Sequence, residues 1–134
     1  MRFDFLELPG ESPAPLLRPV VPVQVEDLEE APQLCLVDSG STANRFGAWL
    51  AAATGIDLTG APETELAVGG VRTVAKHARA DLTIGGVRYD APVSFCEPWP
   101  FAFNLLGQEG FLRYFRTTLC AAEGWLELDR EPAA

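Results

Sequence analysis

The sequence predicts a mostly β single domain with two short helices. Its 134 residues match the usual length of one domain, and 48% of them are hydrophobic, which is enough for a core. Between residues 63 and 95, runs rich in β-branched residues alternate with Gly-Gly pairs. Because a Gly-Gly pair supplies the positive φ angles of a two-residue turn, this middle region predicts two successive hairpins.

The first third of the chain predicts strands separated by a connector and a turn. Residues 3–8 alternate weakly and fit a strand, and "PGESPAP" has the prolines of a connector. The alternating valines of "VVPVQV" predict a second strand, in which Pro22 requires an edge or a non-bonded position. After the acidic "EDLEEAPQ", which predicts a solvated turn, the apolar "LCLV" fits a strand buried on both faces.

Two short helices and a closing hairpin complete the predicted elements. The segment "NRFGAWLAAATG" predicts a helix ending at Gly55, because four apolar residues follow helical spacing: Phe46, Trp49, Leu50 and Ala53. "NLLGQEGFLRYF" predicts a strand end that runs into a second helix, and "TTLCAAEGWLEL" a hairpin that turns near Glu123 and Gly124.

Charge and composition exclude several classes of partner. Ten Lys and Arg against nineteen Asp and Glu give a formal charge of −9, a poor match for nucleic acid or an anionic membrane surface. No run of ~18 apolar residues predicts a membrane span. The N-terminal "MRFDFLELPGESP" mixes charges with apolar residues, unlike a signal peptide, so a cytoplasmic location is the default.

The three cysteines predict neither a metal site nor a disulfide framework. Cys35, Cys96 and Cys120 are odd in number, far apart in sequence and free of any C-x-x-C spacing. Without a secretion signal, disulfides are not expected. We therefore expect three reduced, buried thiols, no metal and no cofactor.

The segment "LVDSGST" puts an ionisable Asp38 at the end of an apolar strand, followed by Ser39, Gly40 and Ser41. A carboxylate in that position loses hydration and must be neutralised, paired or given hydrogen-bond donors. One interpretation is an Asx-type turn without chemistry. The other is a catalytic carboxylate, which the hairpin turn at residues 69–70 and the segment "FNLLGQEGFL" favour.

In this order, the three elements resemble the retroviral-type (retropepsin-like) aspartic proteases and their single-domain bacterial relatives. The resemblance covers about residues 20–128 and is most specific in the pairing of "LVDSGST" with "NLLGQEGFL". It implies a closed β-barrel with a hairpin flap and an endopeptidase that acts on peptide or protein substrates. The implied organisation is an N-terminal strand and connector (1–18), a protease domain (19–129) and a tail (130–134).

The chemistry of this class requires a second carboxyl group. One ionised carboxyl takes a proton from water while a protonated one polarises the scissile carbonyl, and two carboxyls ~3 Å apart cannot both ionise. No other aspartate directly precedes Ser/Thr-Gly. The nearest candidate is Asp57 in "GIDLTG", where one extra residue separates the aspartate from Thr-Gly. The second Asp38 must then come from a second chain, which predicts a twofold homodimer.

The resemblance assigns roles to the residues after Asp38. Ser39 would link the two active-site loops across the twofold axis, and Gly40 would bring its N–H close to the carboxylate. The Ser41 hydroxyl would bond the outer carboxylate oxygen. A donor to the ionised form favours that form, so we expect the native protein to have a more acidic pH optimum than Ser41→Ala.

The resemblance also assigns residues farther along the chain. Gly69 and Gly70 would form the flap tip, and Leu106 with Gly107 the structural motif. The expected substrate contacts come from the wall loop "EPWPFAF" and the strand after it: Trp99, Phe101 and Leu105. An ordinary surface hairpin and plain core packing stay open as alternatives. Gln108 follows Gly107 where the family commonly has Arg or Met, so the viral inter-subunit salt bridge is not expected.

Other hydrolase classes fit less well. The only histidine, His77, is predicted on the solvated face of a hairpin arm, and no G-x-S-x-G surrounds Ser39 or Ser41. Cys35 is predicted deep in a strand, where a thiol is inert. The remaining alternative is a catalytically inactive dimeric β module that binds peptides or mediates assembly.

Overall fold

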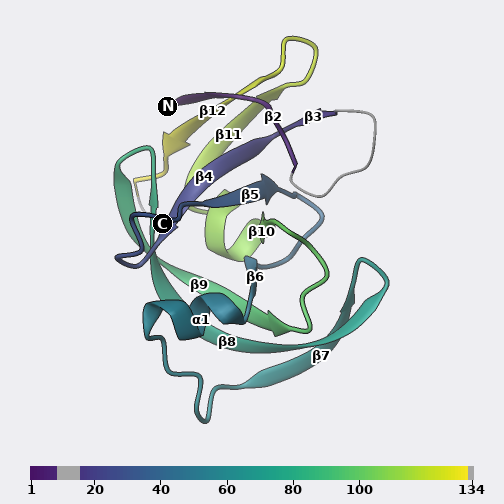
Figure 1. Cartoon of the computed structure of the whole chain (residues 1–134). Coiled ribbons are helices and arrows are strands. Elements are labelled where there is room, and N and C mark those ends of the chain that lie inside the picture. Colours follow the sequence, from purple (N-terminus) through teal and green to yellow (C-terminus); the bar gives the residue numbers. More distant parts are fainter. Residues whose placement is uncertain (9–15, 133–134) are drawn as a thin grey trace.

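Six strands close into a mixed β-barrel in the computed structural model, which describes residues 1–8 and 16–132 (Figure 1). Around the barrel the order is β4 (Val20–Val25), β5 (Gln33–Val37), β10 (Asn104–Leu106), β6 (Arg45–Gly47), β9 (Val87–Glu97) and β8 (Val71–Ile84). The ring closes where Val25 of β4 pairs with Leu82 of β8. The predicted mostly β, closed-barrel fold is confirmed.

Two parallel pairings bring the predicted motifs together. Strand β10 runs parallel to β5, with Leu106 opposite Val37, and β6 runs parallel to β9, with Phe46 opposite Phe95. Because parallel neighbours end at the same edge, the loop after β5 and the chain after β10 leave the barrel side by side. Pro22 pairs with Leu34 of β5 only, which fits the non-bonded position expected for a proline.

Both hairpins predicted at the Gly-Gly pairs are confirmed, as is the closing hairpin, in which β11 pairs with β12. Strand β7 (Glu63–Val68) pairs with β8 through a turn in which Gly69 and Gly70 have φ angles of 57° and 78°. The β8–β9 turn uses the other Gly-Gly pair, with φ angles of 55° and 82°. L-residues with a Cβ rarely adopt such angles. The tip of the β7–β8 hairpin projects beyond the barrel (Figure 1).

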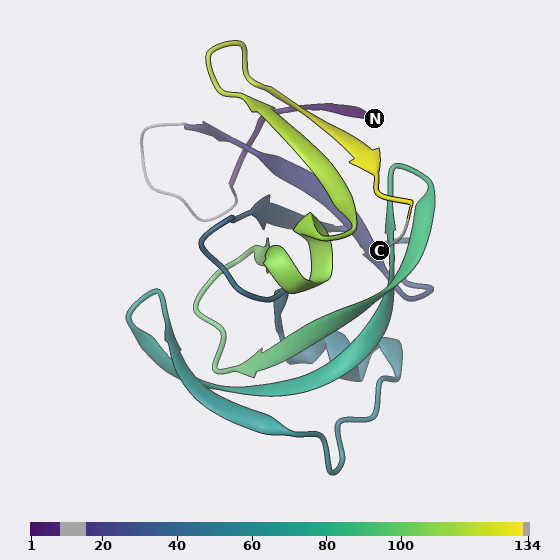
Figure 2. The ribbon, with the colours of Figure 1, turned by 180° about the vertical axis from the view of Figure 1, so that it is seen from behind.

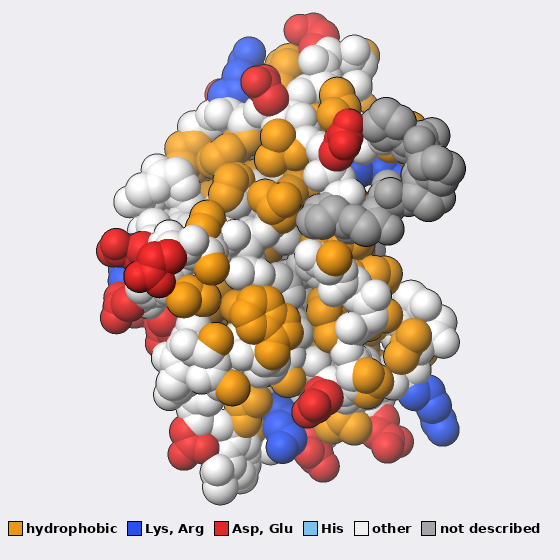
Figure 3. All heavy atoms as spheres, in the orientation of Figure 1, with side chains coloured by type: hydrophobic (Ala, Val, Ile, Leu, Met, Phe, Trp, Pro, Cys, Tyr) orange, Lys and Arg blue, Asp and Glu red, His pale blue; other side chains and the backbone are white. Residues whose placement is uncertain are grey.

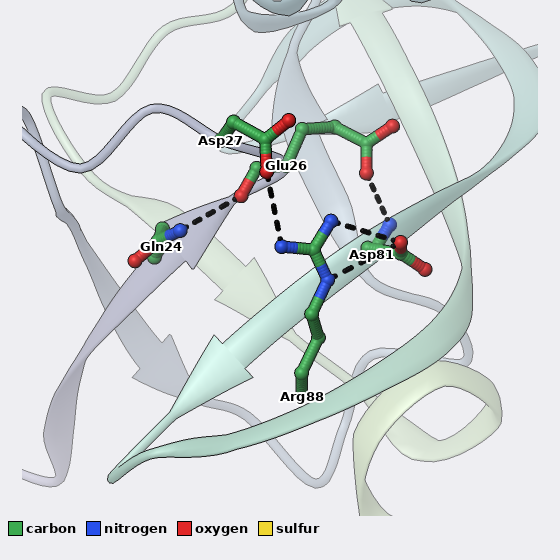
Figure 4. A network of polar contacts seen from close by, with 5 residues as sticks. All are labelled: Gln24, Glu26, Asp27, Asp81 and Arg88. Atoms are coloured by element: carbon green, nitrogen blue, oxygen red, sulfur yellow. Dashed lines mark hydrogen bonds and ion pairs between the residues drawn. The ribbon is translucent and has the colours of Figure 1, made fainter.

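Charged side chains cover the place where the barrel closes. Arg88 of β9 bonds Asp81 at 3.0 Å and Asp27 at 3.1 Å, and Glu26 accepts the backbone N–H of Asp81 at 2.8 Å (Figure 4). The Gln24 side chain donates to the Glu26 carbonyl at 2.9 Å. These contacts tie the turn after β4 to the β8–β9 hairpin.

The chain ends form a second sheet within one chain. Its order is β1 (Arg2–Asp4), β12 (Trp125–Arg130) and β11 (Phe115–Cys120), all antiparallel. A short pair, β2 (Leu6–Glu7) and β3 (Leu17–Arg18), follows β1. The three-stranded sheet lies at the opposite end of the molecule from β7 (Figures 1 and 2). The predicted connector "PGESPAP" and the last two tail residues lie outside the described residues.

The first predicted helix is shorter than expected. Helix α1 (Trp49–Thr54) ends at Gly55 as predicted, with a φ angle of 76°. The assignment of Phe46 to this helix is wrong, because Phe46 lies in β6 and packs edge-on against Phe95. Of the other residues at the predicted helical spacing, Leu50 is buried, whereas Trp49 is 55% exposed and Ala53 is exposed.

The second predicted helix exists as a π-helix, η1 (Gln108–Leu112). Within the described part of the chain, no helix has both the length and the apolar character needed to cross a membrane.

Burial differs from the sequence expectation at two places. In β5, Cys35 and Val37 are buried, whereas Leu34 and Leu36 are half-buried, so the strand is not covered equally on both faces. All three cysteines are free thiols, but Cys120 is half-buried rather than buried. The reason is that Cys120 ends β11, an edge strand of the terminal sheet.

Candidate active site

Asp38 extends the parallel ladder one residue beyond β5. Its backbone N–H donates to the Leu106 carbonyl at 2.9 Å, so β10 fixes the direction in which the chain leaves the strand. The carboxylate oxygen Oδ1 then accepts the Gly40 N–H at 3.0 Å, and the Asp38 carbonyl accepts the Ser41 N–H at 3.1 Å. Asp38 is therefore a half-buried carboxylate held in an Asx turn.

A Cβ atom on Gly40 would lie 3.2 Å from Asp38 Oδ1, tighter than ordinary contact. Glycine at this position lets the backbone N–H reach the carboxylate without crowding it.

A buried asparagine supports this turn from behind. Asn44 is fully buried and receives the Gly107 N–H at 3.1 Å. Its amide group donates to the carbonyls of Gly110 at 2.9 Å and Pro92 at 3.2 Å. The Asn44 side chain thus joins the loop after Asp38 to three places: Pro92 in β9, Gly107 just before η1, and Gly110 within η1. Sequence reasoning missed Asn44, because the residue type alone does not reveal its burial.

Gly107 allows the active-site loop and η1 to touch. A Cβ atom on Gly107 would overlap the Ala43 and Ser41 backbone carbonyls. In its absence, the Gln108 N–H reaches the Ser41 carbonyl at 2.9 Å and the Glu109 N–H reaches the Thr42 carbonyl at 3.0 Å. The pairing of the two sequence motifs is therefore a direct backbone contact.

Gln108 holds the exposed part of the same loop. Its side-chain amide donates to the Ser39 carbonyl at 2.8 Å. The sequence pattern marks Gln108 only as a departure from the family motif and does not predict this bond. The sequence feature that could have indicated this contact is the position of Gln108 directly after Gly107.

The structure corrects the expected role of Ser41. Its hydroxyl donates to the Ala43 carbonyl at 2.7 Å instead of to the Asp38 carboxylate. A serine hydroxyl has one proton to donate, so this bond occupies it. The basis for an acid shift caused by Ser41 is thereby lost, and the residue supports the loop by shaping its backbone.

Asp38 opens into a groove between the barrel end and the β7–β8 hairpin. The groove has a volume of about 250 Å³. The described residues that line it are Asp38, Gly40, Ser41, Thr42, Arg45, Leu66, Ala67, Val68 and Leu105. Three of these belong to β7, so the hairpin forms the wall opposite the carboxylate. Leu105 lies in the groove, as expected of a pocket-lining residue.

Trp99 and Phe101 belong to an aromatic cluster near the hairpin tip. Phe101 packs against the hairpin tip, since a Cβ atom on Gly69 would lie 2.6 Å from its ring. Phe101 also stacks on Phe103 at a centroid distance of 4.8 Å, and Trp99 meets it edge-on at 5.5 Å. Neither side chain is among the described residues that line the groove. Phe101 thus contacts the hairpin tip, and Trp99 donates its ring N–H to the Phe103 carbonyl at 2.9 Å.

The residues that other hydrolase classes would require are His77, as a general base, and Cys35, as a nucleophile. His77 is half-buried, and its two ring nitrogens lie 2.9 Å from Ser94 Oγ and 3.0 Å from Thr64 Oγ1. Both of these hydroxyls lie outside the active-site loop. Complete burial raises the pKa of the Cys35 thiol far above its usual range, so Cys35 stays protonated.

Comparison with known proteins identifies the fold. No protein-family model and no curated protein sequence matches the chain. Among solved structures, the retroviral protease-like domain of Ddi1 from Leishmania major matches with a TM-score of 0.63 and 16% identity, covering 85% of this chain and 90% of that one. A retropepsin-like aspartic protease from Rickettsia conorii matches with a TM-score of 0.60 and 15% identity, covering 94% and 97%. The chain therefore has the retropepsin-like fold.

Proposed function

We propose that this protein is an aspartic endopeptidase that acts as a homodimer. The observation that carries the proposal is the half-buried Asp38 carboxylate, held by the Gly40 N–H and facing a groove under a β-hairpin. The retropepsin-like fold supports the same class. The substrate is a peptide segment that enters the groove in an extended conformation.

In the proposed reaction, Asp38 of one chain is ionised and the partner's Asp38 is protonated. The ionised carboxylate takes a proton from a water molecule while the water oxygen attacks the carbonyl carbon of the scissile bond. The protonated carboxyl gives its proton to the carbonyl oxygen, which stabilises the developing charge. The resulting diol then collapses: the C–N bond breaks, the departing nitrogen receives a proton from the carboxyl that was first ionised, and a diol hydroxyl returns its proton to the other carboxylate as the carbonyl re-forms.

Dimerisation is part of the proposal because each chain supplies only one such carboxyl. The described surface has apolar area available for association, since Leu16, Leu17, Trp49 and Leu119 are each more than half exposed. Figure 3 shows apolar side chains grouped over one face, with charged side chains mainly near its margins. Exposed apolar patches of this kind are typical of interaction sites.

The neighbouring elements receive roles consistent with their positions. The β7–β8 hairpin, with Gly69 and Gly70 at its tip, is the flap that closes over the substrate and excludes water. The aromatic residues that touch the tip, led by Phe101, limit how far the closed flap can move. Ser39, exposed at the edge of the loop, is the residue proposed to meet its counterpart across the twofold axis.

The test is cleavage of a denatured protein and a peptide library between about pH 3 and 7, with and without pepstatin. We expect cleavage by the native protein, inhibition by pepstatin and no cleavage by Asp38→Asn. The molar mass in solution is measured on the same samples, and a dimer is expected. A dimer that binds peptides but cleaves none at any pH would instead support the catalytically inactive module.

A further inference from the structure

Arg45 is the one basic residue among the described residues that line the groove. It lies in β6, between Leu105 of β10 and Ser94 of β9, and is half-buried. Arg45 follows Asp38 by seven residues in the chain, and β10 pairs both with β5, which leads to Asp38, and with β6, which carries Arg45. A permanent positive charge thus lines the same groove as the proposed catalytic carboxylate.

The Arg45 guanidinium is held in place by neutral groups. It donates to Thr42 Oγ1 at 3.3 Å. Burial raises the pKa of the Cys96 thiol, and the nearby Arg45 guanidinium opposes that rise. The bond to Thr42 uses one of the five N–H donors of the guanidinium and leaves the others available to a ligand.

No carboxylate of the described residues neutralises Arg45. Ion pairs within residues 1–8 and 16–132 are made by five other arginines: Arg2, Arg79, Arg88, Arg113 and Arg116. The side chains of these five arginines are at least 45% exposed, so water can solvate their charges even without an ion-pair partner. Arg45 differs from these five because a peptide bound in the groove would cover it, and its charge would then need a negatively charged partner.

A peptide bound in the groove would remove water from Arg45, which is costly unless a negative group replaces the water. A planar guanidinium matches a carboxylate with two parallel hydrogen bonds. The negative charge of Asp38 opposes an acidic substrate, but Coulomb energy falls with distance and screening, so a directly bonded pair outweighs a more distant repulsion.

We infer that Arg45 is a specificity-determining residue that binds the carboxylate of a Glu or Asp side chain in the substrate. This inference rests on the proposed peptide-binding function of the groove. Since a twofold dimer carries two copies of Arg45, the preferred acidic residues occur at two positions, equally far from the scissile bond on either side. A substrate with Lys at either position is disfavoured.

The experiment uses amidated peptides in which Glu, Gln or Lys is moved through each position around a cleaved bond. For the native dimer we expect kcat/KM to be about ten- to a hundredfold higher with Glu than with Gln at the two preferred positions, the usual range for hydrogen bonds to charged groups. Arg45→Leu removes this preference, Arg45→Lys keeps part of it, and Arg45→Glu turns it toward Lys. Arg79→Leu, an exposed arginine paired with Asp90, is the matched control and leaves it intact.

Two results with the amidated peptides would overturn the inference. One is an unchanged Glu preference in Arg45→Leu. The other is an equal loss on all peptides with a shifted pH profile, which would assign Arg45 to the charge of Asp38 instead of to the substrate. A second peptide set with a free C-terminus separates the two sources of a carboxylate. Selectivity that appears only in that set would mean that Arg45 binds a chain end, contrary to the inference.

Binding measurements separate failure of the inference from failure of the proposed function. Fluorescence anisotropy with Asp38→Asn reports binding of the same peptides without cleavage. If the native protein cleaves nothing but Asp38→Asn binds Glu peptides in an Arg45-dependent way, the protease proposal fails and the specificity inference stands. If the native protein cleaves peptides without Arg45-dependent selectivity, the protease proposal stands and the specificity inference fails. If neither cleavage nor selective binding is found, both the protease proposal and the specificity inference fail.

Discussion

Two aspartates in this chain begin the same kind of turn, an Asx turn. Asp38 Oδ1 accepts the N–H of Gly40, two residues later, at 3.0 Å. Asp57 Oδ1 accepts the N–H of Thr59, also two residues later, at 2.9 Å. Judged by this local geometry alone, the loop after β5 and the loop after α1 are equivalent.

The two turns differ in what surrounds them. Asp38 continues a strand that pairs with β10, and the buried Asn44 lies behind its loop. Asp57 is exposed, lies between α1 and β7, and is not among the described residues that line the groove. An Asx turn therefore does not define a site by itself. The site arises where tertiary pairing holds the turn at the edge of a groove.

The largest expected difference between the turns is in activity. Asp38→Asn keeps an oxygen that can accept the Gly40 N–H but cannot take a proton from water, so we expect cleavage to fall about a thousandfold or more. Asp57→Asn is expected to cleave at the native rate. Initial rates on one peptide check both variants, and circular dichroism confirms that each is folded. Equal losses in the two variants would end the distinction between the loops.

The next largest difference is in stability. Asn44→Ala leaves the buried Gly107 N–H without its partner, which is expected to lower the free energy of unfolding by about 2–3 kcal/mol. Asp57→Ala removes only an exposed hydrogen bond and is expected to have a much smaller effect. Urea unfolding measures both. A loss in Asn44→Ala no greater than in Asp57→Ala would show that the support behind Asp38 is not needed.

The smallest effect concerns the titration of Asp57. Hydrogen bonds from the Thr59 backbone and hydroxyl hold the pKa of Asp57 below its ordinary value of 3.8. Because the folded-state pKa is lowered, the associated stability is present above pH 3.8 and is lost as pH falls through the folded pKa. Carboxyl NMR titration of the native protein and of Thr59→Ala checks this. We expect a higher Asp57 pKa in the variant, and an unchanged value would contradict the assigned cause.

Sequence patterns predicted the parts of the fold that depend on neighbours in the chain. The Gly-Gly pairs predicted both hairpins, Gly55 predicted the end of α1, and "LVDSGST" predicted a strand that ends at a carboxylate. These features follow from backbone conformations that only certain residues allow. A local pattern is sufficient to specify them.

The failures have a different origin. Phe46 was assigned to a helix because its spacing to Leu50 suits one, but pairing with β9 and β10 makes its three-residue segment a strand. Asn44, Arg45 and Gln108 were not foreseen as site residues, because their roles depend on partners from other elements. The Ser41 hydroxyl has an acceptor two residues away that the family resemblance did not suggest.

Mixing subunits tests the central claim most directly, because the claim is that two Asp38 carboxyls from two chains form one site. Native protein and Asp38→Asn are combined at constant total concentration and allowed to exchange subunits. We predict that activity falls as the square of the native fraction, to about a quarter at equal amounts, since only dimers with two native chains are active. A linear fall, to about half, would mean that each chain works alone and would contradict the shared site.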